Sequence, residues 1–375
     1  MHLTADIVLF SFFCLSFLVQ LYFHLFVFRR LAFYKKETSG TVLSPASIII
    51  CARSEQNNLS EHLTSVLNQN YPEYEVIVVD DCSYDNTDEV LKKFSKEYDH
   101  LKIVTIKEDK HYTHGKKLAQ LVGIKGAKYE HLLFTDADCK PVSSNWLRNM
   151  MNGFDEEETE IVLGYGAYEK TKTWLNKVIR FDTFYIALQY LSFALLDKPY
   201  MGVGRNLAYK KSLFFRNRGF ATHYHLESGD DDLFVHEAAT NNNCEIEIGS
   251  SSITVSKPKT NYSDWIKQKR RHITTGSHYQ FKTKAPLGIL TINPYLFFAF
   301  FFSLLCIQTY FLIPMLSLFL IRYITQMIIF SRAMRTLGEK DLLLFSPLLE
   351  LQLLFFYPIF LFVNIFSGKK NKWKN

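Results

Sequence analysis

Two pairs of aspartates follow apolar runs of the sequence. Asp80 and Asp81 end the run "VIVVDD", and Asp136 and Asp138 end the run "HLLFTDAD". Neighbouring carboxylates repel one another unless a cation or a hydrogen-bond donor compensates them. A D-x-D segment also offers hard oxygen ligands, which suit Mg²⁺ or Mn²⁺ held beside a phosphate group. The residue types therefore indicate a divalent-cation site at Asp136 and Asp138.

The acidic pairs fall at the ends of predicted β-strands. The pattern predicts strands at residues 46–51, 75–79, 101–106 and 131–135, and amphipathic helices at 59–70, from Thr87 through Phe94, and at 116–127. Strands that alternate with helices in this way predict βαβ units and a largely parallel sheet, an α/β fold. Ligands bind at the carboxyl ends of the strands in such sheets, so we expect both acidic pairs to face one crevice.

Long apolar segments flank this predicted α/β domain. Residues 7–28 contain no Asp, Glu, Lys or Arg and are long enough to cross a bilayer core of about 30 Å. They lack a basic n-region and a cleavage site, which favours a retained anchor over a signal peptide. Residues 287–330, broken at Pro314, are enough for two spans, and residues 342–366 are a weaker candidate because they carry Glu350.

These segments predict four regions of the chain. Residues 1–30 form a transmembrane anchor, residues 45–280 a soluble domain, residues 285–366 a membrane region of two or three spans, and residues 367–375 a basic tail. The positive-inside rule places the soluble domain in the cytoplasm, because Arg29, Arg30, Lys35 and Lys36 follow the first segment and no Lys or Arg precedes it. The lysines of the tail would lie outside if residues 342–366 also crossed, so that segment either spans the membrane or lies in its interface.

Charge and cysteine usage exclude some classes of protein. The formal net charge of +6 over 375 residues is modest and gives no indication of a nucleic-acid partner. The six cysteines have no paired CxxC spacing, which fits a reducing compartment without disulfides. Cys51, Cys82 and Cys139 fall near predicted strand ends, but buried thiols are a better interpretation than a zinc site.

The order of the motifs resembles that of a known family. The segments "SIIICARSEQNNLSEHLTSVLNQNYPEYEVIVVDDCSYDNT", "HGKKLAQ" and "LLFTDADCKP" are similar to those of the family-2 glycosyltransferases, over about residues 46–280. The resemblance implies a GT-A (Rossmann-like) nucleotide-sugar-binding domain, a UDP-sugar donor, a Mg²⁺ or Mn²⁺ cofactor and inversion at the anomeric carbon. It also fits the membrane-bound members of the family.

The resemblance assigns donor contacts to matching positions. The positions matched to the nucleoside, the ribose, the phosphates and the metal are Ala52, Arg53, Glu55, Asp80, Asp81, Lys116, Asp136 and Asp138. Asp81 matches the uracil-contacting position, and Asp136 and Asp138 match the ribose and metal contacts. His111 and His114 lie in a polar loop beside lysines, and we expect them to cover the donor rather than to bind a metal.

Two further motifs concern the acceptor and the chemistry. "GVGRNLAY", with Gly204 and Asn206, resembles the segment against the donor sugar and the acceptor, although a plain turn would also explain its glycines. "ESGDDDLF" resembles the acidic motif that supplies the catalytic base. Alignment on Leu233 places the base at Asp230, and Gly229 stands where Glu is commoner, which leaves Asp231 as an alternative.

A basic segment completes the resemblance. "WIKQKRRH" is similar to the family's Q-x-x-R-W signature, with Gln268 and Arg271 in place and His272 where Trp is usual. The signature implies contacts with the diphosphate and the acceptor, and Arg271 can bind phosphate bidentately. The other basic side chains of the segment, Lys267, Lys269 and Arg270, are suited to anionic lipid headgroups.

Three functions remain open from the sequence. The first is transfer of one sugar to a lipid or an envelope-glycan intermediate at the cytoplasmic face of a bacterial inner membrane. The second is processive polysaccharide synthesis by the same site, for which two or three C-terminal helices are few. The third is a non-catalytic membrane scaffold that binds a nucleotide sugar, which the intact D-x-D and acidic motifs disfavour.

Overall fold

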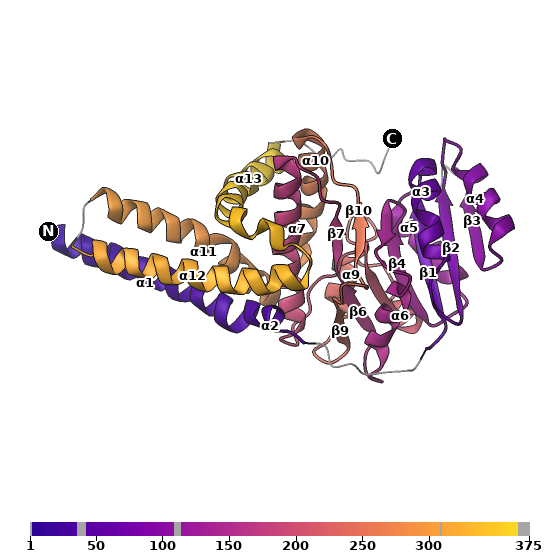
Figure 1. Cartoon of the computed structure of the whole chain (residues 1–375), viewed down its shortest axis with the longest axis horizontal. Helices are drawn as coiled ribbons and strands as arrows, with labels where there is room; N and C mark the ends of the chain where they lie inside the picture. The colour runs from indigo at the N-terminus through magenta and orange to yellow at the C-terminus, as the bar shows by residue number, and fades with distance from the viewer. Residues whose placement is uncertain (1, 36–42, 109–113, 308–309, 367–375) are drawn as a thin grey trace. The chain divides into compact units, whose positions relative to one another are not determined.

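The computed structural model describes residues 2–35, 43–108, 114–307 and 310–366. The chain divides into two compact units. One consists of Met1–Lys35 and His278–Ile359 and is helical, and the other consists of Lys36–Ser277 and Phe360–Asn375 and is α/β (Figure 1). The α/β fold predicted from the sequence is therefore confirmed.

A seven-stranded sheet forms the centre of the α/β unit. Its strands, in spatial order, are β3 (Leu101–Ile106), β2 (Tyr74–Asp81), β1 (Ala46–Ala52), β4 (His131–Asp136), β8 (Leu207–Lys210), β6 (Ile161–Gly164) and β9 (Cys244–Glu247). The first four strands are mutually parallel, β8 is antiparallel to both of its neighbours, and β6 and β9 are parallel. β2 extends two residues beyond the predicted strand, so Asp80 and Asp81 end the strand itself.

A second, three-stranded sheet lies in the same unit. It contains β5 (Cys139–Pro141), β10 (Thr254–Ser256) and β7 (Gly166–Tyr168), with β10 in the centre. β5 follows the D-x-D turn directly, and β7 follows β6 after one residue. Both sheets therefore contribute residues close to the turn that carries Asp138.

Helices complete the α/β unit. They are α3 (Gln56–Leu67), α4 (Thr87–Glu97), α5 (Lys116–Gly126), α6 (Trp146–Met151), α7 (Trp174–Ala194), α8 (Lys211–Arg216), α9 (Asp232–Ala238) and α10 (Tyr262–Ile273), with short 3₁₀ turns at Asn152–Phe154 and Thr274–His278. α7 was not predicted. Its residues are largely buried around the helix, so the sequence shows no clear amphipathic period there.

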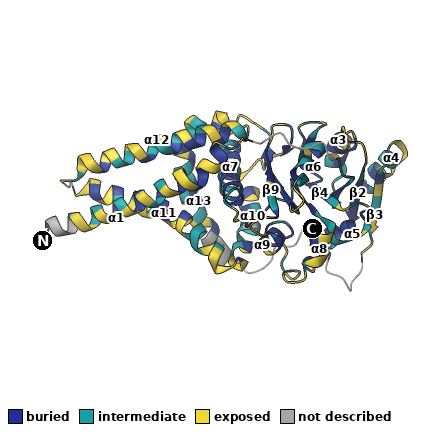
Figure 2. Cartoon of the chain, turned by 90° about the horizontal axis from the view of Figure 1, so that it is seen from below, coloured by how far each residue is buried: buried dark blue, intermediate teal, exposed yellow. Residues whose placement is uncertain are grey.

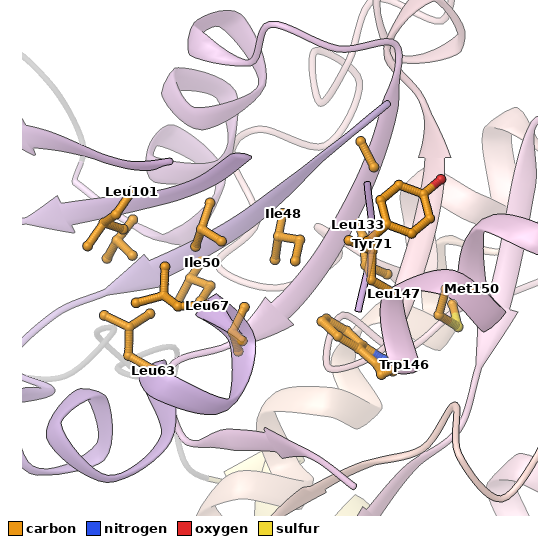
Figure 3. Close-up of a cluster of buried hydrophobic side chains, with 14 of the residues drawn as sticks. Ile48, Ile50, Leu63, Leu67, Tyr71, Leu101, Leu133, Trp146, Leu147 and Met150 are labelled. Atoms are coloured by element: carbon orange, nitrogen blue, oxygen red, sulfur yellow. The ribbon is translucent and has the colours of Figure 1, made fainter. Parts of the chain in front are cut away.

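The strands of the large sheet are buried on both faces, which is typical of parallel sheets. Ile48 and Ile50 of β1 pack in one cluster with Leu63 and Leu67 of α3 (Figure 3). Ile49 points to the opposite face, where it contacts α5 at Gly123. This two-sided burial fixes the register of β1, because a shift by one residue would exchange the two faces.

Within the described residues, four helical segments are long and apolar enough to cross a membrane. These segments are Asp6–Ala32, Phe281–Cys306, Leu312–Thr336 and Lys340–Phe360. They comprise α1 (His2–Tyr22) continued by a π-helical turn (Phe23–Phe28) and α2 (Arg29–Ala32), then α11 (Phe281–Cys306), α12 (Leu312–Thr336), and a 3₁₀ turn (Lys340–Phe345) with α13 (Ser346–Phe366). Exposed residues run along α1, α11 and α12 (Figure 2), and many of them are large and apolar, among them Phe12, Leu18, Phe26, Ile292, Ile313 and Leu320. Such surfaces are expected to face lipid.

The break in the long apolar block differs from the prediction. α11 ends at Cys306 and α12 begins at Leu312, so Pro314 lies in the first turn of α12 rather than at the break. Proline is tolerated there because the first amide groups of a helix have no partner within the helix.

A buried polar cluster compensates the charge of Glu350. Arg322 Nη2 lies 2.5 Å from Glu350 Oε1, and Arg322 Nε donates a hydrogen bond to Gln20 Oε1 at 2.7 Å. Gln326 Nε2 donates to Glu350 Oε2 at 2.9 Å. The presence of Glu350 made residues 342–366 a weaker candidate for a membrane span in the sequence. A carboxylate paired in this way is compatible with an apolar environment.

Candidate active site

The register of the central strands brings the acidic residues to one edge of the large sheet. β1 lies between β2 and β4, and its residues Ala52 and Cys51 pair with Asp80 and Asp136 respectively. Parallel strands end on the same side of a sheet, so both acidic pairs meet at its carboxyl edge.

Lys116, the first residue of α5, joins two acidic segments that are far apart in the chain. Its ammonium nitrogen lies 2.9 Å from Asp136 Oδ1 and 3.1 Å from Asp230 Oδ2. Burial alone would lower the pKa of Lys116, but the negative charges of Asp136 and Asp230 raise it well above its usual value. Lys116 therefore remains a cation and holds the acidic motif beside the D-x-D turn.

The pKa values of the two carboxyl groups of the D-x-D turn are shifted in opposite directions. Burial alone would raise the pKa of Asp136, but the charge and hydrogen bond of Lys116 lower it below the usual value. The pKa of Asp138 is raised, first by burial and then by the charge of Asp136. Asp138 thus lies where a further positive charge would stabilise its ionised form.

The donor set of this turn fits a hard divalent cation. Ligand atoms of Asp136, Asp138 and Cys139 all lie within 4.8 Å of one another. Burial raises the pKa of the Cys139 thiol well above its usual value, so the thiol stays protonated and is a poor ligand. The two carboxylates remain, and their oxygen atoms suit Mg²⁺ or Mn²⁺.

Asp230 is buried beside Lys116. Besides the ion pair with Lys116, its Oδ2 accepts a hydrogen bond from Gln120 Nε2 at 3.1 Å. Lys116 and Gln120 lie one turn apart on α5 and hold the same carboxylate oxygen. The position of Asp230 relative to Asp136 is therefore set by one helix.

Asp231 has different surroundings from Asp230. It is the N-cap of α9, where its Oδ1 accepts from the amide of Asp232 at 2.8 Å. Its Oδ2 accepts from the amide of Gly204 at 2.7 Å. Burial, followed by the charges of Asp230 and Asp232, raises the pKa of Asp231 to about 7. A carboxylate with this pKa can exchange a proton near neutral pH.

Gly204 comes close to the acidic cluster, as the sequence predicts for this segment, whereas Asn206 does not. A Cβ at Gly204 would lie 3.3 Å from both Asp231 Oδ2 and Lys116 Nζ. Asn206 is fully buried, and its side-chain amide bonds to Trp146 Nε1, Tyr165 O and Ser252 O. It stabilises the scaffold and leaves no hydrogen-bonding group for a ligand.

Asp81 is the last residue of β2 and lies at the same carboxyl edge of the large sheet. Its side chain is completely buried, its Oδ1 lies 3.0 Å from His114 Nδ1, and its Oδ2 lies 4.0 Å from Arg53 Nη1. Arg53 in turn donates to Tyr84 Oη at 3.3 Å and lies over the Tyr84 ring, 5.7 Å from its centroid. These four side chains form a polar and aromatic group beside the end of β2.

The remaining residues of this region stabilise the loops. Asp80 Oδ1 accepts from both the amide and the hydroxyl of Ser83, which compensates its charge within the turn. Ala52 is buried at the end of β1, and the amide of Glu55 donates to Thr87 Oγ1 at 3.0 Å. Asp80 and Asp81 are therefore compensated by different partners on opposite faces of the strand.

Cys82 and His114 lie together but have partners without a metal. Ligand atoms of Asp81, Cys82 and His114 lie within 4.8 Å of one another. Cys82 Sγ donates to Ile106 O at 3.2 Å, and burial raises the pKa of the thiol. That His114 covers the donor rather than binding a metal stays a prediction. His111 lies outside the described residues.

α10 carries the basic motif. Gln268 Nε2 donates to Tyr168 Oη at 3.3 Å, and the positive charge of Arg271 contributes to the lowered pKa of Asp136. Lys269, which the sequence suggested for lipid headgroups, instead forms a buried ion pair with Asp182 at 2.6 Å. That interpretation of Lys269 was wrong, because the partner on α7 was not predictable. The side chain of His272 lies outside the described part of the structure.

Two basic residues of this region were missed in the sequence. Lys117 donates to three backbone carbonyls, those of His223 at 2.5 Å, Leu226 at 3.0 Å and Ser228 at 2.8 Å. This loop leads directly into Asp230. Arg205 lies over the ring of Tyr168, with its guanidinium carbon 4.4 Å from the centroid. The doubled lysine of "HGKK" and the Arg of "GVGRN" were the only sequence signals for them.

Comparison with known proteins identifies related sequences. The model of the family "Glycosyl transferase family 2" matches residues 47–216. Glycosyltransferase AglE of Haloferax volcanii is 34% identical over 32% of this chain and 38% of its own length. A poly-beta-1,6-N-acetyl-D-glucosamine synthase of Staphylococcus epidermidis is 35% identical over 30% of this chain and 25% of its own length. A beta-monoglucosyldiacylglycerol synthase of Trichormus variabilis is 32% identical over 36% of this chain and 29% of its own length. The chain thus spans well under half the length of each of these relatives.

One solved structure resembles nearly the whole chain. It is mannosyltransferase PcManGT from Pyrobaculum calidifontis in complex with GDP-Man and Mn²⁺, with a TM-score of 0.59 and 16% sequence identity. The similarity covers 97% of this chain and 99% of that chain. At this identity it supports the fold, a GT-A-like α/β domain accompanied by helices.

Proposed function

We propose that the protein is a family-2 glycosyltransferase, because residues 47–216 match the model of that family, and that it transfers a sugar from a UDP-sugar to a lipid or envelope-glycan acceptor. The observation that carries the proposal is the double ion pair of Lys116, which places the acidic motif of Asp230 beside the D-x-D aspartate Asp136. A cation beside the leaving diphosphate and a carboxylate base beside the acceptor hydroxyl are two groups that can promote inverting sugar transfer.

The proposed donor site extends along the strand ends. Asp81, Arg53 and Tyr84 would contact the nucleoside, because Asp81 offers a buried acceptor and Tyr84 an exposed ring beside it. Asp136 and Asp138 would hold Mg²⁺ or Mn²⁺, which would neutralise the charge that develops on the leaving diphosphate. Arg271 supplies a second positive charge to the same region.

Asp230 is the proposed general base. Its carboxylate accepts a proton from the acceptor hydroxyl, and the hydroxyl oxygen attacks the anomeric carbon from the side opposite the diphosphate. Lys116 and Gln120 fix this carboxylate, while both oxygens of Asp231 are engaged by backbone amides. Asp231 remains the second candidate, since its pKa of about 7 suits proton transfer near neutrality.

The acceptor is proposed to be lipid-linked. The described residues include four helices suited to a membrane, and a membrane-bound transferase would encounter lipid acceptors. Of the relatives, one is named as a synthase of a glucosyldiacylglycerol and one as a synthase of a polysaccharide, so single transfer and processive synthesis remain the two candidates.

The domain is proposed to face the cytoplasm of a bacterial inner membrane. Arg29 and Arg30 lie in the last turn of the first apolar segment and Lys35 follows it, and cytoplasmic flanks are enriched in such residues. A single cysteine placed at Lys35 in a cysteine-free chain should react with a membrane-impermeant maleimide only after the cells are opened. Reaction in intact cells would reverse the orientation and contradict the use of cytoplasmic nucleotide sugars.

Transfer itself is tested with purified protein and a total lipid extract. Radiolabelled UDP-sugars and GDP-sugars are supplied separately with Mn²⁺, and the products are separated by size. We expect one UDP-sugar to label a product of lipid size. A polymeric product would instead establish processive synthesis, and nucleotide-sugar binding without any product would support the scaffold function.

A further inference from the structure

Arg205 has an unusually fixed side chain next to the D-x-D turn. Its guanidinium lies over the ring of Tyr168, 4.4 Å from the centroid, and against Gly166. A Cβ at Gly166 would lie 3.3 Å from Arg205 Nε and 3.4 Å from its Cζ. Gly166 and Tyr168 lie two residues apart on β7, so one face of that strand supports the whole guanidinium.

One edge of the guanidinium is anchored and the other is free. Nη1 donates to Ser256 Oγ at 2.9 Å and lies 3.4 Å from Ala167 O. The two remaining nitrogens, Nε and Nη2, have no hydrogen-bond partner among the described residues, and Arg205 forms no ion pair with a described carboxylate. Nε and Nη2 are the parallel pair of donors that binds two oxygens of a phosphate or carboxylate.

The backbone of Arg205 is equally well held. Its carbonyl oxygen accepts from Thr135 Oγ1 at 3.1 Å and from Thr254 Oγ1 at 2.9 Å. Thr135 immediately precedes Asp136, and the preceding residue Gly204 donates its amide to Asp231. The free edge therefore belongs to a residue fixed between the D-x-D turn and the acidic motif.

The charge of Arg205 acts on this cluster. Its guanidinium is among the positive charges that act on Asp136 and Asp138. A region with four carboxylates repels a phosphate unless fixed cations compensate them. Arginine whose rotamer is already ordered loses little further entropy when it binds.

We propose that Arg205 is an oxyanion-binding residue, whose Nε and Nη2 bind two oxygens of one phosphate group of the substrate. The inference rests on the proposed function and deepens it, since it assigns a phosphate contact outside the D-x-D and Q-x-x-R motifs. The phosphate belongs either to the diphosphate of the donor or to a phosphorylated lipid acceptor. Both present the same pair of oxygens to a guanidinium.

The test measures binding rather than transfer. Isothermal titration calorimetry of the full chain in detergent gives the affinity for pyrophosphate with Mn²⁺, and separately for dodecyl phosphate. Arg205→Gln removes the charge and the parallel donor pair of Nε and Nη2. Arg205→Lys keeps the charge without the bidentate geometry. Arg216→Gln is the matched control, because Arg216 forms an exposed ion pair with Glu160. Thermal unfolding of each variant confirms that it is folded.

We expect Arg205→Gln to weaken one of the two probes by about tenfold to hundredfold, in line with charge-assisted hydrogen bonds, and Arg205→Lys to recover only part of this. Loss of pyrophosphate binding identifies the donor diphosphate, and loss of dodecyl phosphate binding identifies the acceptor. Gly166→Ala, which displaces the guanidinium without removing its charge, should weaken the same probe by a smaller factor.

Unchanged affinity of Arg205→Gln for both probes would overturn the proposal and leave Arg205 as a clamp between strands. That result is independent of sugar transfer, which the labelled-donor screen measures. The native protein could also transfer no sugar while Arg205→Gln still weakens phosphate binding. That combination would support the phosphate site and contradict the proposed sugar transfer.

Discussion

The Lys116 ammonium lies 3.1 Å from Asp230 Oδ2, and this ion pair fixes the acidic motif at the carboxyl edge of the sheet. The same ammonium contacts Asp136 on β4. One cation thus sets the separation between the turn proposed to bind metal and the carboxylate proposed as base.

The D-x-D turn should bind the metal. Asp138→Asn removes one of two carboxylate ligands, so we expect weaker Mn²⁺ binding, measured by electron paramagnetic resonance of free Mn²⁺ in the presence of UDP. Transfer should stop in chelator and return on addition of Mn²⁺ or Mg²⁺. Asp88→Asn is the control, since Asp88 pairs with Lys92 on the exposed surface of α4. Equal Mn²⁺ affinity in Asp138→Asn and the native protein would contradict the assignment.

Lys117 should position the base without contacting the donor. Its ammonium holds the carbonyls of His223, Leu226 and Ser228, and Lys117→Met leaves these groups unpaired at a cost of about 1–3 kcal/mol of stability. We expect turnover to fall about tenfold while the affinity for UDP stays unchanged. Lys125→Met on the exposed side of the same helix is the control. A loss of UDP affinity equal to the loss of turnover would show that Lys117 acts on the donor instead.

Asp231 should make stability depend on pH. Its folded-state pKa of about 7 is above the usual 3.8, so between these values the folded protein keeps a proton that the unfolded chain has lost. The contribution of this proton to the free energy of unfolding is fully present below about pH 4 and is lost as the pH rises through 7. Asp231→Asn does not titrate, and its melting temperature relative to the native protein should therefore rise between about pH 5 and 8. A constant difference over this range would show that the pKa of Asp231 is not raised.

The buried pair Arg322–Glu350 should be coupled. Arg322→Leu leaves Glu350 unpaired in apolar surroundings and should destabilise the helical unit by about 3–5 kcal/mol, measured by unfolding in detergent. Adding Glu350→Leu should restore most of this loss, because two apolar side chains replace the pair. Arg332→Leu, at an exposed position of the same helix, should have little effect. Additive losses in the double variant would exclude a direct interaction.

Much of the carboxyl edge of the large sheet was predictable because its signals are local. An apolar run followed by acidic residues identifies a strand end, and the alternation of strands and helices implies that such ends meet. For that reason Asp81, which ends β2, and Asp136 and Asp138, at and just after the end of β4, were expected on this edge and lie there. The family resemblance added Lys116 and Asp230, which the structure joins by an ion pair.

The residues that were missed depend on contacts between distant segments. Lys117 binds backbone carbonyls, which leave no trace in the sequence of the loop that supplies them. Arg205 is fixed by Tyr168 and Ser256 from two short strands of the small sheet, which the pattern did not predict. Asn206 differs in the opposite way. The resemblance assigned it a contact with the sugar or the acceptor, whereas its side chain is buried within the scaffold.

The central claim is that Asp230 acts as the base of sugar transfer. The most direct measurement compares the turnover of the native protein, Asp230→Asn and Asp231→Asn with a labelled UDP-sugar, alongside their affinities for UDP. Asparagine keeps the shape of the side chain but cannot take the proton, so Asp230→Asn should lower turnover by about 10²-fold or more and leave UDP affinity unchanged. Retained turnover in Asp230→Asn with loss in Asp231→Asn would move the base to Asp231, and retained turnover in both would contradict a base in this motif.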